Sequence, residues 1–184
     1  MLSKKIGWIL LLLLLLSGLG LHGASDGKIR FKQISLEQGL SQTYVYCIYE
    51  DKDGFMWFGT QDGLNKYDGY EFKIYRPDIE NPYSISGNRI QTIFEDAEGS
   101  MWIGTGRSGL NKFDRKTERF HRYRFKQGDP DSISNDGITS FAEDEQGMLW
   151  IGTQFGLNRF DPKTGKFKRF FNGNGDSQEA TGIS

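Results

Sequence analysis

The chain has 184 residues and a formal net charge of -1, with 24 glycines, 4 prolines and 14% aromatic residues. This near-neutral balance argues against the basic surface of nucleic-acid-binding proteins, and a single cysteine excludes an intrachain disulfide. Frequent glycine together with many aromatic residues favours short strands joined by tight turns over helices.

The first predicted element is apolar. Two lysines precede a run from Ile6 to Leu21, and the small residues Gly23, Ala24 and Ser25 follow it. A positive start, an apolar core and a small-residue exit are typical of a secretory signal peptide. Residues 1–25 are therefore predicted to be a signal helix, with an uncleaved membrane anchor as the alternative. Under either interpretation the rest of the chain is periplasmic or otherwise exported, and it meets the membrane only through this segment, which would anchor it in the inner membrane if it is not cleaved.

After residue 27 the sequence repeats itself three times. The segment from Trp57 to Asp68, WFGTQDGLNKYD, returns in similar form from Trp102 and again from Trp150, at spacings of 45 and 48 residues. A Glu-Asp pair, a glycine and a serine precede each tryptophan at constant distances, and the differences in length fall in turns. Self-similarity at such a period indicates a repeat architecture.

Each unit is predicted to form four short strands. In the second unit, alternating apolar and polar residues predict a strand over Ile90–Glu95, followed by a turn at residues 96–99. Further strands are predicted over residues 101–105, 110–114 and 119–125, and a crossing loop over residues 126–135. Four strands in about 45 residues is the period of a propeller blade.

The predicted fold is therefore all-β: three four-stranded antiparallel β-propeller blades, an incomplete propeller, after the N-terminal signal helix. The blades are expected within residues 28–184, at about 34–80, 81–128 and 129–175, with the start of a fourth blade up to residue 184. Each tryptophan is expected to wedge between neighbouring blades, where a nearby glycine allows close approach (Gly59, Gly104 and Gly152).

Three blades cannot close a ring, because propellers typically have four to eight. The chain is therefore expected to be the N-terminal fragment of a longer protein. If it is a full-length product, self-association is the expected way to cover the open faces.

The repeated pattern is Glu-Asp-x-x-Gly-x-x-Trp, then Gly-Thr, then Gly-Leu-Asn-x-[Tyr/Phe]-Asp. It resembles the two-component regulator propeller repeat, which occurs in the periplasmic part of bacterial hybrid histidine kinases and some diguanylate cyclases. The segment Ile34–Ser41 also resembles the entry to the first blade of such proteins, so the resemblance covers about residues 30–171. It implies a ligand-sensing propeller joined to a membrane crossing and a signalling output. The chain itself carries no kinase, cyclase or receiver segment.

No catalytic constellation is predicted, and the chain is expected to be neither an enzyme nor a cofactor or metal binder. Histidine occurs only twice, which argues against a metal site or a histidine-based triad. The Gly104–Gly109 segment matches a dinucleotide fingerprint, but no helix is predicted after it. Cys47 aligns with Thr92 and Ser140, which indicates a small strand residue and not a nucleophile. Basic runs at residues 122–126 and 166–169 are predicted to protect the outer strand edge.

Two functional classes remain open. The first is the extracytoplasmic ligand-sensing portion of a two-component receptor; the alternative is an exported scaffold or protein-interaction module without signalling output. The expected partners are an extracytoplasmic ligand, for which the resemblance suggests carbohydrate, and further blades of a parent chain or a second copy. No nucleic acid is expected.

Propeller ligands usually bind over the central channel, so the turns between the second and third strands supply the candidate ligand-binding residues. These six residues are Gln61, Asp62, Arg107, Ser108, Gln154 and Phe155. They vary between units while their neighbours stay constant. Contact positions and freely varying surface turns both produce that pattern, and the sequence leaves the two interpretations open.

Overall fold

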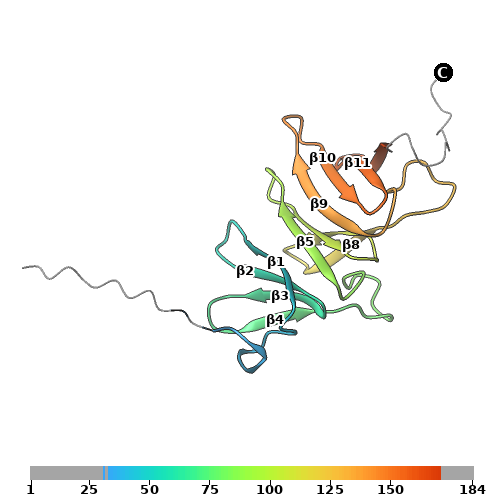
Figure 1. Cartoon of the computed structure of the whole chain (residues 1–184). Coiled ribbons are helices and arrows are strands. Elements are labelled where there is room, and N and C mark those ends of the chain that lie inside the picture. Colours follow the sequence, from blue (N-terminus) through green and yellow to red (C-terminus); the bar gives the residue numbers. More distant parts are fainter. Residues whose placement is uncertain (1–30, 32, 171–184) are drawn as a thin grey trace, which may run out of the picture. The chain divides into compact units, whose positions relative to one another are not determined.

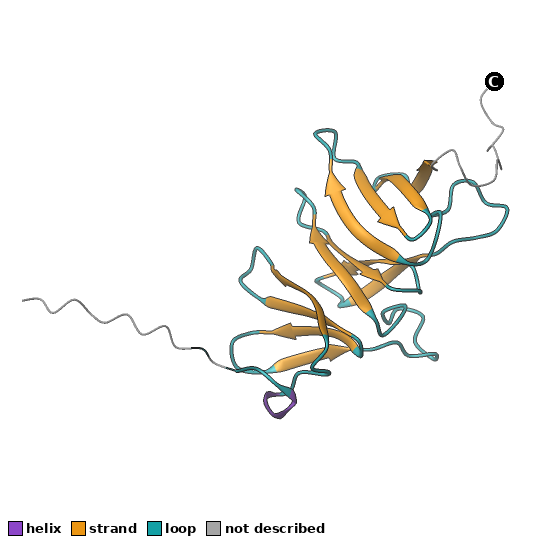
Figure 2. Ribbon diagram, in the orientation of Figure 1, coloured by secondary structure: helices purple, strands orange, loops and turns teal. Residues whose placement is uncertain are grey.

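The computed structural model describes Phe31 and residues 33–170. The predicted signal helix and the predicted start of a fourth blade lie outside the described residues. All described strands belong to the compact unit that begins at Ile34. A single 3-10 turn, Leu36–Gln38, precedes the first strand, and every other regular element among the described residues is a strand (Figure 2).

The strands form three four-stranded antiparallel sheets (Figure 1). The first sheet contains β1 (Val45–Glu50), β2 (Met56–Thr60), β3 (Gly63–Tyr67) and β4 (Phe72–Tyr75). The second contains β5 (Ile90–Glu95), β6 (Met101–Thr105), β7 (Leu110–Asp114) and β8 (Arg119–Tyr123). The third contains β9 (Ile138–Glu143), β10 (Leu149–Thr153), β11 (Gly156–Asp161) and β12 (Lys166–Phe170). Strand order follows chain order in each sheet, so each repeat is one propeller blade and the predicted all-β fold is confirmed.

The fourth predicted strand of the second unit is too long. It ends at Tyr123 and not at Phe125. The Phe125 amide donates to Asp136 Oδ1 at 2.8 Å, which draws the chain out of the sheet and into the loop that enters the third blade. A long-range side-chain acceptor of this kind has no signal in the local alternation of residues.

The aspartate of each Glu-Asp pair closes the first hairpin of its blade. Asp51 Oδ1 accepts from the amides of Asp53 and Phe55 at 3.0 Å, and Asp51 Oδ2 accepts from Trp57 Nε1 at 2.7 Å. Gly54 has φ 83° and completes this turn, because the left-handed region is accessible to glycine at little cost. The corresponding tryptophan bonds in the other blades, Trp102 to Asp96 and Trp150 to Asp144, measure 2.8 and 2.9 Å.

A buried asparagine joins the third strand of each blade to the loop that enters the same blade. Asn65 Oδ1 accepts from the Ser41 amide at 2.8 Å, and Asn65 Nδ2 donates to Ser41 Oγ at 2.8 Å. The same pair of bonds recurs twice, between Asn111 and Ser86 and between Asn158 and Ser134. Buried amide groups need such partners, which explains why serine and asparagine recur in step with the tryptophan.

The apolar cores lie between blades and not within them. One cluster combines Trp57 and Leu64 of the first blade with residues of the second, and the other combines Trp102 and Leu110 of the second blade with residues of the third. Trp57 meets Phe113 of the next blade at 5.4 Å between ring centroids, and Trp102 meets Phe160 at 5.3 Å, both edge to face. The prediction that tryptophan wedges between blades is confirmed for Trp57 and Trp102, whereas Trp150 is partly buried and stacks on Phe170 of its own blade.

We call the interface between the first two blades the first seam and that between the second and third blades the second seam. Polar contacts beside the first hairpins also join the blades at both seams. Glu95 accepts from the Lys52 amide of the first blade, and Glu143 accepts from the Ala97 amide of the second. Only the first seam among the described residues has a bridging guanidinium. Arg115 Nη1 lies 2.7 Å from Asp51 Oδ2, and its Nη2 lies 2.8 Å from Glu95 Oε1.

The glycines beside the tryptophans give a matched test of blade contact. A Cβ on Gly104 would lie 2.7 Å from Ile138 Cγ2 of the next blade, whereas the nearest atoms to a Cβ on Gly152 belong to its own sheet. Gly104→Ala is expected to lower the free energy of unfolding by about 1–3 kcal/mol through overpacking, and Gly152→Ala by less. Urea denaturation of both variants measures the difference, and equal losses would contradict a close seam at Gly104.

Asp51 and Asp96 form a second matched pair. Burial acts to raise the pKa of Asp51, but hydrogen bonds from Trp57 and Arg115 outweigh it and hold the pKa below its usual range. Asp51→Asn is expected to cost about 2–3 kcal/mol, because the charged acceptor of the Trp57 and Arg115 hydrogen bonds is lost, although Arg115 keeps Glu95 as a partner. Asp96→Asn, which lacks such an arginine, is expected to cost less.

The lowered pKa of Asp51 predicts how the stability of the protein depends on pH. A lowered native pKa gives stability that is present above the carboxyl pKa of the unfolded chain, about 4, and is lost as pH falls through the lower native pKa. The difference in urea midpoint between the wild type and Asp51→Asn should therefore narrow in acid. A difference that stays constant from pH 7 to pH 3 would contradict a charged role for Asp51.

Candidate functional site

The first strands of the three blades, β1, β5 and β9, lie side by side at the inner edges of the sheets (Figure 1). At the end where these strands begin, each accepts a backbone hydrogen bond from the turn between the second and third strands. The three bonds run from Gln61 to Tyr44, from Gly106 to Arg89 and from Gln154 to Gly137, at 3.2, 2.9 and 2.8 Å. The predicted ligand turns therefore meet the inner strands here. We call the beginnings of β1, β5 and β9, with these turns, the inner rim.

A β-bulge shapes the inner rim in every blade. The pairing of β1 with β2 passes from Val45 opposite Thr60 to Cys47 opposite Gly59, which leaves Tyr46 as the extra residue. Gln91 and Thr139 occupy the same place in the other blades. Bulges redirect side chains and are frequent beside functional sites. The repeated framework thus displays a different side chain at one fixed position in each blade.

Tyr46 is the centre of a polar and aromatic cluster that spans the first seam. The Arg89 guanidinium of the second blade lies 4.7 Å from the Tyr46 ring centroid, within the range of a cation–π interaction. The Tyr44 ring, 62% exposed, lies 5.0 Å from that of Tyr46, and Tyr46 Oη lies 3.3 Å from Gln61 Oε1. Gly106 takes the place of Gln61 in the second blade and leaves room for the Arg89 side chain to lie across it.

The structure separates the six predicted ligand-binding residues. Gln61 belongs to the Tyr46 cluster, and the Gln154 side chain lies against Gly137 at the beginning of β9. Asp62 is engaged by Arg76, whose Nη2 lies 3.0 Å from Asp62 Oδ2, and Ser108 lies against Gly87 of the preceding loop. Arg107 and Phe155 are exposed.

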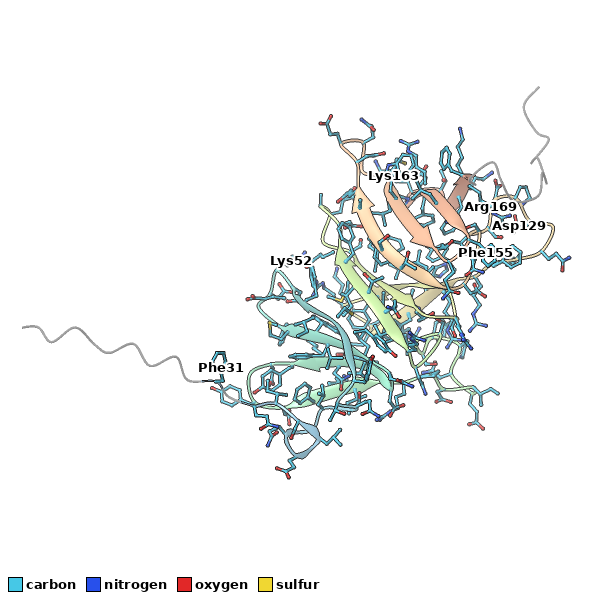
Figure 3. All side chains as sticks on the ribbon, in the orientation of Figure 1. Phe31, Lys52, Asp129, Phe155, Lys163 and Arg169 are labelled. Carbon is cyan, nitrogen blue, oxygen red and sulfur yellow. The ribbon has the colours of Figure 1, made fainter. Side chains whose placement is uncertain are left out.

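All six lie at the same end of the sheets. Phe155 and Lys163, labelled in Figure 3, mark the two opposite ends of the third blade. Within residues 33–170 no hydrogen bond or ion pair joins predicted ligand-binding residues of different blades. The six predicted residues thus share one end of the sheets, but those of different blades are not joined to one another by hydrogen bonds or ion pairs.

Sequence reasoning missed Tyr44, Tyr46 and Arg89. The signal that identifies them was available, since the units align at these positions. Tyr44 aligns with Arg89 and Gly137, and Tyr46 aligns with Gln91 and Thr139. The position between them is a branched apolar residue in all three units (Val45, Ile90 and Ile138). Because residue type varies among the units at these positions beside a constant apolar position, they could have been predicted as contact positions by the same reasoning that selected the turn residues.

The opposite end of the first seam holds a shallow cleft of about 480 Å³. Its lining is acidic and includes Glu50, Asp51, Glu95 and Glu98. Asp51 and Glu95 are already engaged by Arg115, and Asp51 also holds the first hairpin closed. This end of the seam is therefore occupied by structural contacts.

Two arginines of the predicted basic runs have a different role from edge protection. Arg122 Nε donates to the Ser84 carbonyl at 2.7 Å, and Arg169 Nε donates to the Ser132 carbonyl at 2.7 Å. Each arginine therefore fastens the loop that enters its own blade. In the first blade Ile74 stands at this position, opposite Asn65.

Cys47 lies on β1 at the first seam, and its environment disfavours the thiolate. Burial raises the pKa of the Cys47 thiol to about 11, and a backbone hydrogen bond from Gly59 lowers it only in part. The thiolate is the reactive form, so Cys47 has the features of a packing residue.

This environment gives a chemical prediction. At pH 8 native Cys47 should react with iodoacetamide about 100-fold more slowly than in the urea-unfolded chain, because the thiolate fraction falls about tenfold per unit of pKa. The raised native pKa also means that Cys47 favours the folded state below about pH 9, and that this contribution is lost as pH rises toward 11. The Cys47→Ser variant should lack this alkaline loss. Equal native and unfolded labelling rates would contradict the prediction.

The meander order, the interlocked tryptophans and the inner rim define the class of protein: these are consecutive blades of a β-propeller. The model of the two-component regulator propeller family matches residues 39–62, 84–107 and 132–155, once in each blade. The three units are therefore two-component regulator propeller repeats.

Known proteins of this kind are much longer than the chain. The extracellular domain of a putative hybrid two-component system from B. thetaiotaomicron is 36% identical, with a TM-score of 0.71 over 76% of this chain and 20% of that domain. A histidine kinase, P4, of Formosa agariphila is 49% identical over 63 residues, 34% of this chain and 5% of the kinase. The chain therefore spans a fifth or less of the length of these relatives. Within the described residues no helix has the length and apolar character needed to cross a membrane.

Proposed function

We propose that the chain is the extracytoplasmic ligand-sensing part of a bacterial two-component receptor, and that the ligand binds at the inner rim across the first seam. The observation that carries this proposal is the cluster of Tyr44, Tyr46 and Arg89. These side chains stand at varying positions of an otherwise constant framework. No catalytic role is assigned to any residue.

The geometry of the cluster suits recognition of a small extended ligand. Tyr44 offers an exposed aromatic face, and Gln61 and Arg89 add hydrogen-bonding groups beside it. Exposed aromatic residues with a few convergent polar groups are typical of binding sites. Because Tyr46 and Arg89 belong to different blades, a ligand held by both would couple binding to the relation between those blades. That coupling is a physical route from ligand to signal.

The relatives support the biological setting of this proposal. The solved relative is described as the extracellular domain of a hybrid two-component system, and the other relative is a histidine kinase. By analogy, the parent receptor would carry the output domain beyond a membrane crossing. Carbohydrate is the first ligand class to test, since an exposed tyrosine beside amide and guanidinium groups can stack on a sugar ring and bond its hydroxyls.

Direct binding tests the proposal. The exported chain is screened by thermal shift against neutral and acidic oligosaccharides and a peptide library, followed by calorimetry on the compounds that raise the melting temperature. Tyr44→Ala and Arg89→Ala are each expected to weaken binding about tenfold or more, as for residues at the centre of an interface.

Lys163→Ala, an exposed change at the opposite end of the third blade, is the control and should leave affinity unchanged. A ligand that binds the wild type and both rim variants equally would place the site elsewhere. Absence of any ligand, for the chain and for a receptor containing it, would favour the scaffold alternative.

A further inference from the structure

The inner rim carries positive charge that its own contacts do not neutralise. The charged side chains of its turns and of the residues that lead into β1, β5 and β9 are Asp62, Arg89, Arg107 and Asp136. Asp62 is paired with Arg76, and Asp136 Oδ1 accepts from the Phe125 amide at 2.8 Å. Neither Arg89 nor Arg107 forms an ion pair with any described residue. The charge left uncompensated on this surface is therefore positive.

The exposure of these two arginines is a property of the second blade. Arg89 and Arg107 are exposed although a described blade packs on each side of this one and closes an apolar core with it. Further blades of a longer parent protein would pack on the first and third blades. They would not cover the two seams beside which these arginines stand.

Arg89 is held in position without being neutralised. Its guanidinium lies 4.7 Å from the Tyr46 ring centroid, and a Cβ on Gly106 would lie 2.9 Å from Arg89 Cδ. An arginine over an aromatic ring can still donate from the edge of its guanidinium to the two oxygens of a carboxylate or a sulfate ester. Arg107 directly follows Gly106, whose amide donates to the Arg89 carbonyl at 2.9 Å. The two arginines therefore leave the backbone close together.

Most of the other polar side chains at the inner rim are neutral. Gln61, Thr139 and Gln154 are exposed there, and Ser108 is partly buried. Amide and hydroxyl groups both donate and accept hydrogen bonds, as the hydroxyls of a sugar also do. A carbohydrate that carries acidic groups can engage these side chains and the arginines at once.

The charge at the opposite end of the first seam favours the same kind of ligand. The cleft at that end is lined by Lys52 and by five carboxylates, those of Glu50, Asp51, Glu95, Asp96 and Glu98. Although Arg115 bridges two of these carboxylates, negative charge predominates. An anion is therefore attracted toward the inner rim and repelled from the opposite end.

We propose that the ligand of the inner rim is an acidic oligosaccharide, whose carboxylate or sulfate group is held by Arg89 and Arg107. This assignment rests on the proposed function, because it names the ligand class of the same site. The two arginines are then the residues that determine specificity. Without them the inner rim keeps its hydroxyl-binding groups but does not prefer an acidic sugar over a neutral one.

Pairs of oligosaccharides that differ only in charge test this assignment by calorimetry on the exported chain. One pair is an oligogalacturonate and its carboxyl-reduced form, and the other is a carrageenan oligosaccharide and its desulfated form. At least one acidic member is expected to bind about tenfold or more tightly than its neutral partner, and this preference should shrink as salt rises. The pair that shows the preference identifies carboxylate or sulfate as the recognised group.

Two variants examine the arginines themselves. Arg89→Gln and Arg107→Gln are each expected to weaken binding of the acidic member about tenfold and to leave the neutral member almost unchanged. Arg89→Lys should restore only part of the loss in Arg89→Gln, because an ammonium group lacks the forked donors of a guanidinium. Arg119→Gln is the matched control and should change neither affinity. Arg119 is also exposed and lies 4.5 Å from the centroid of a tyrosine ring, that of Tyr83, but it begins β8 outside the inner rim.

The outcomes separate this assignment from the proposed function. Equal affinity within both pairs, a preference that survives both glutamine variants, or no binding by any of the four oligosaccharides would overturn the assignment. Tighter binding of tetraglutamate than of either acidic sugar would also overturn it, in favour of a peptide ligand. If a neutral sugar bound and Tyr44→Ala weakened its binding, the inner rim would remain the site and only the ligand class would be wrong.

Discussion

The tryptophan on the second strand of each blade is the interaction on which the rest of the structure depends. In every blade an aspartate of the same blade fixes the indole nitrogen, and in the first two blades a phenylalanine of the next blade covers the ring. The first contact sets the ring's orientation and the second supplies its burial. Because a sheet of four strands cannot bury both of its faces alone, a blade has no complete core of its own. The unit of stability is therefore the seam between two blades.

Each blade combines a framework of residues that are constant among the three units with a few exposed positions that vary. Buried asparagine, serine and aspartate side chains hold each turn and loop in the same place in every blade. The bulge at the beginning of the first strand then presents tyrosine, glutamine or threonine at one fixed point. Of the two seams that the structure describes, only the first has the Arg115 contacts with Asp51 and Glu95 at one end and the Tyr46–Arg89 contact at the other. The inner rim can thus vary in chemistry without disturbing the packing behind it.

Much of this architecture could be predicted because the same pattern of residues occurs in three successive units. Residue type and spacing predict the strands of the second unit, except for the end of the fourth. They also predict the position of Trp57 and Trp102 between blades and the closeness of Gly104 to the next blade. The site was predicted less completely. The predicted turn residues lie at the same end of the sheets as the inner rim. Tyr46 and Arg89, however, meet only because two blades pack, and Arg122 bonds Ser84 across 38 residues. Such contacts depend on the arrangement of whole blades, and no local pattern encodes them.

The second blade is the only one, among residues 33–170, with both of its faces covered. Nearest-neighbour contact makes the chain a one-dimensional array, in which each blade is stabilised by what adjoins it. In an isolated polypeptide of residues 33–170, the outer blades are therefore expected to open first, and the amide hydrogens of β5 and β6 to exchange last with solvent. A further blade or another molecule packed on an outer face would therefore slow amide exchange in the blade that it covers, and less so in the blade behind it.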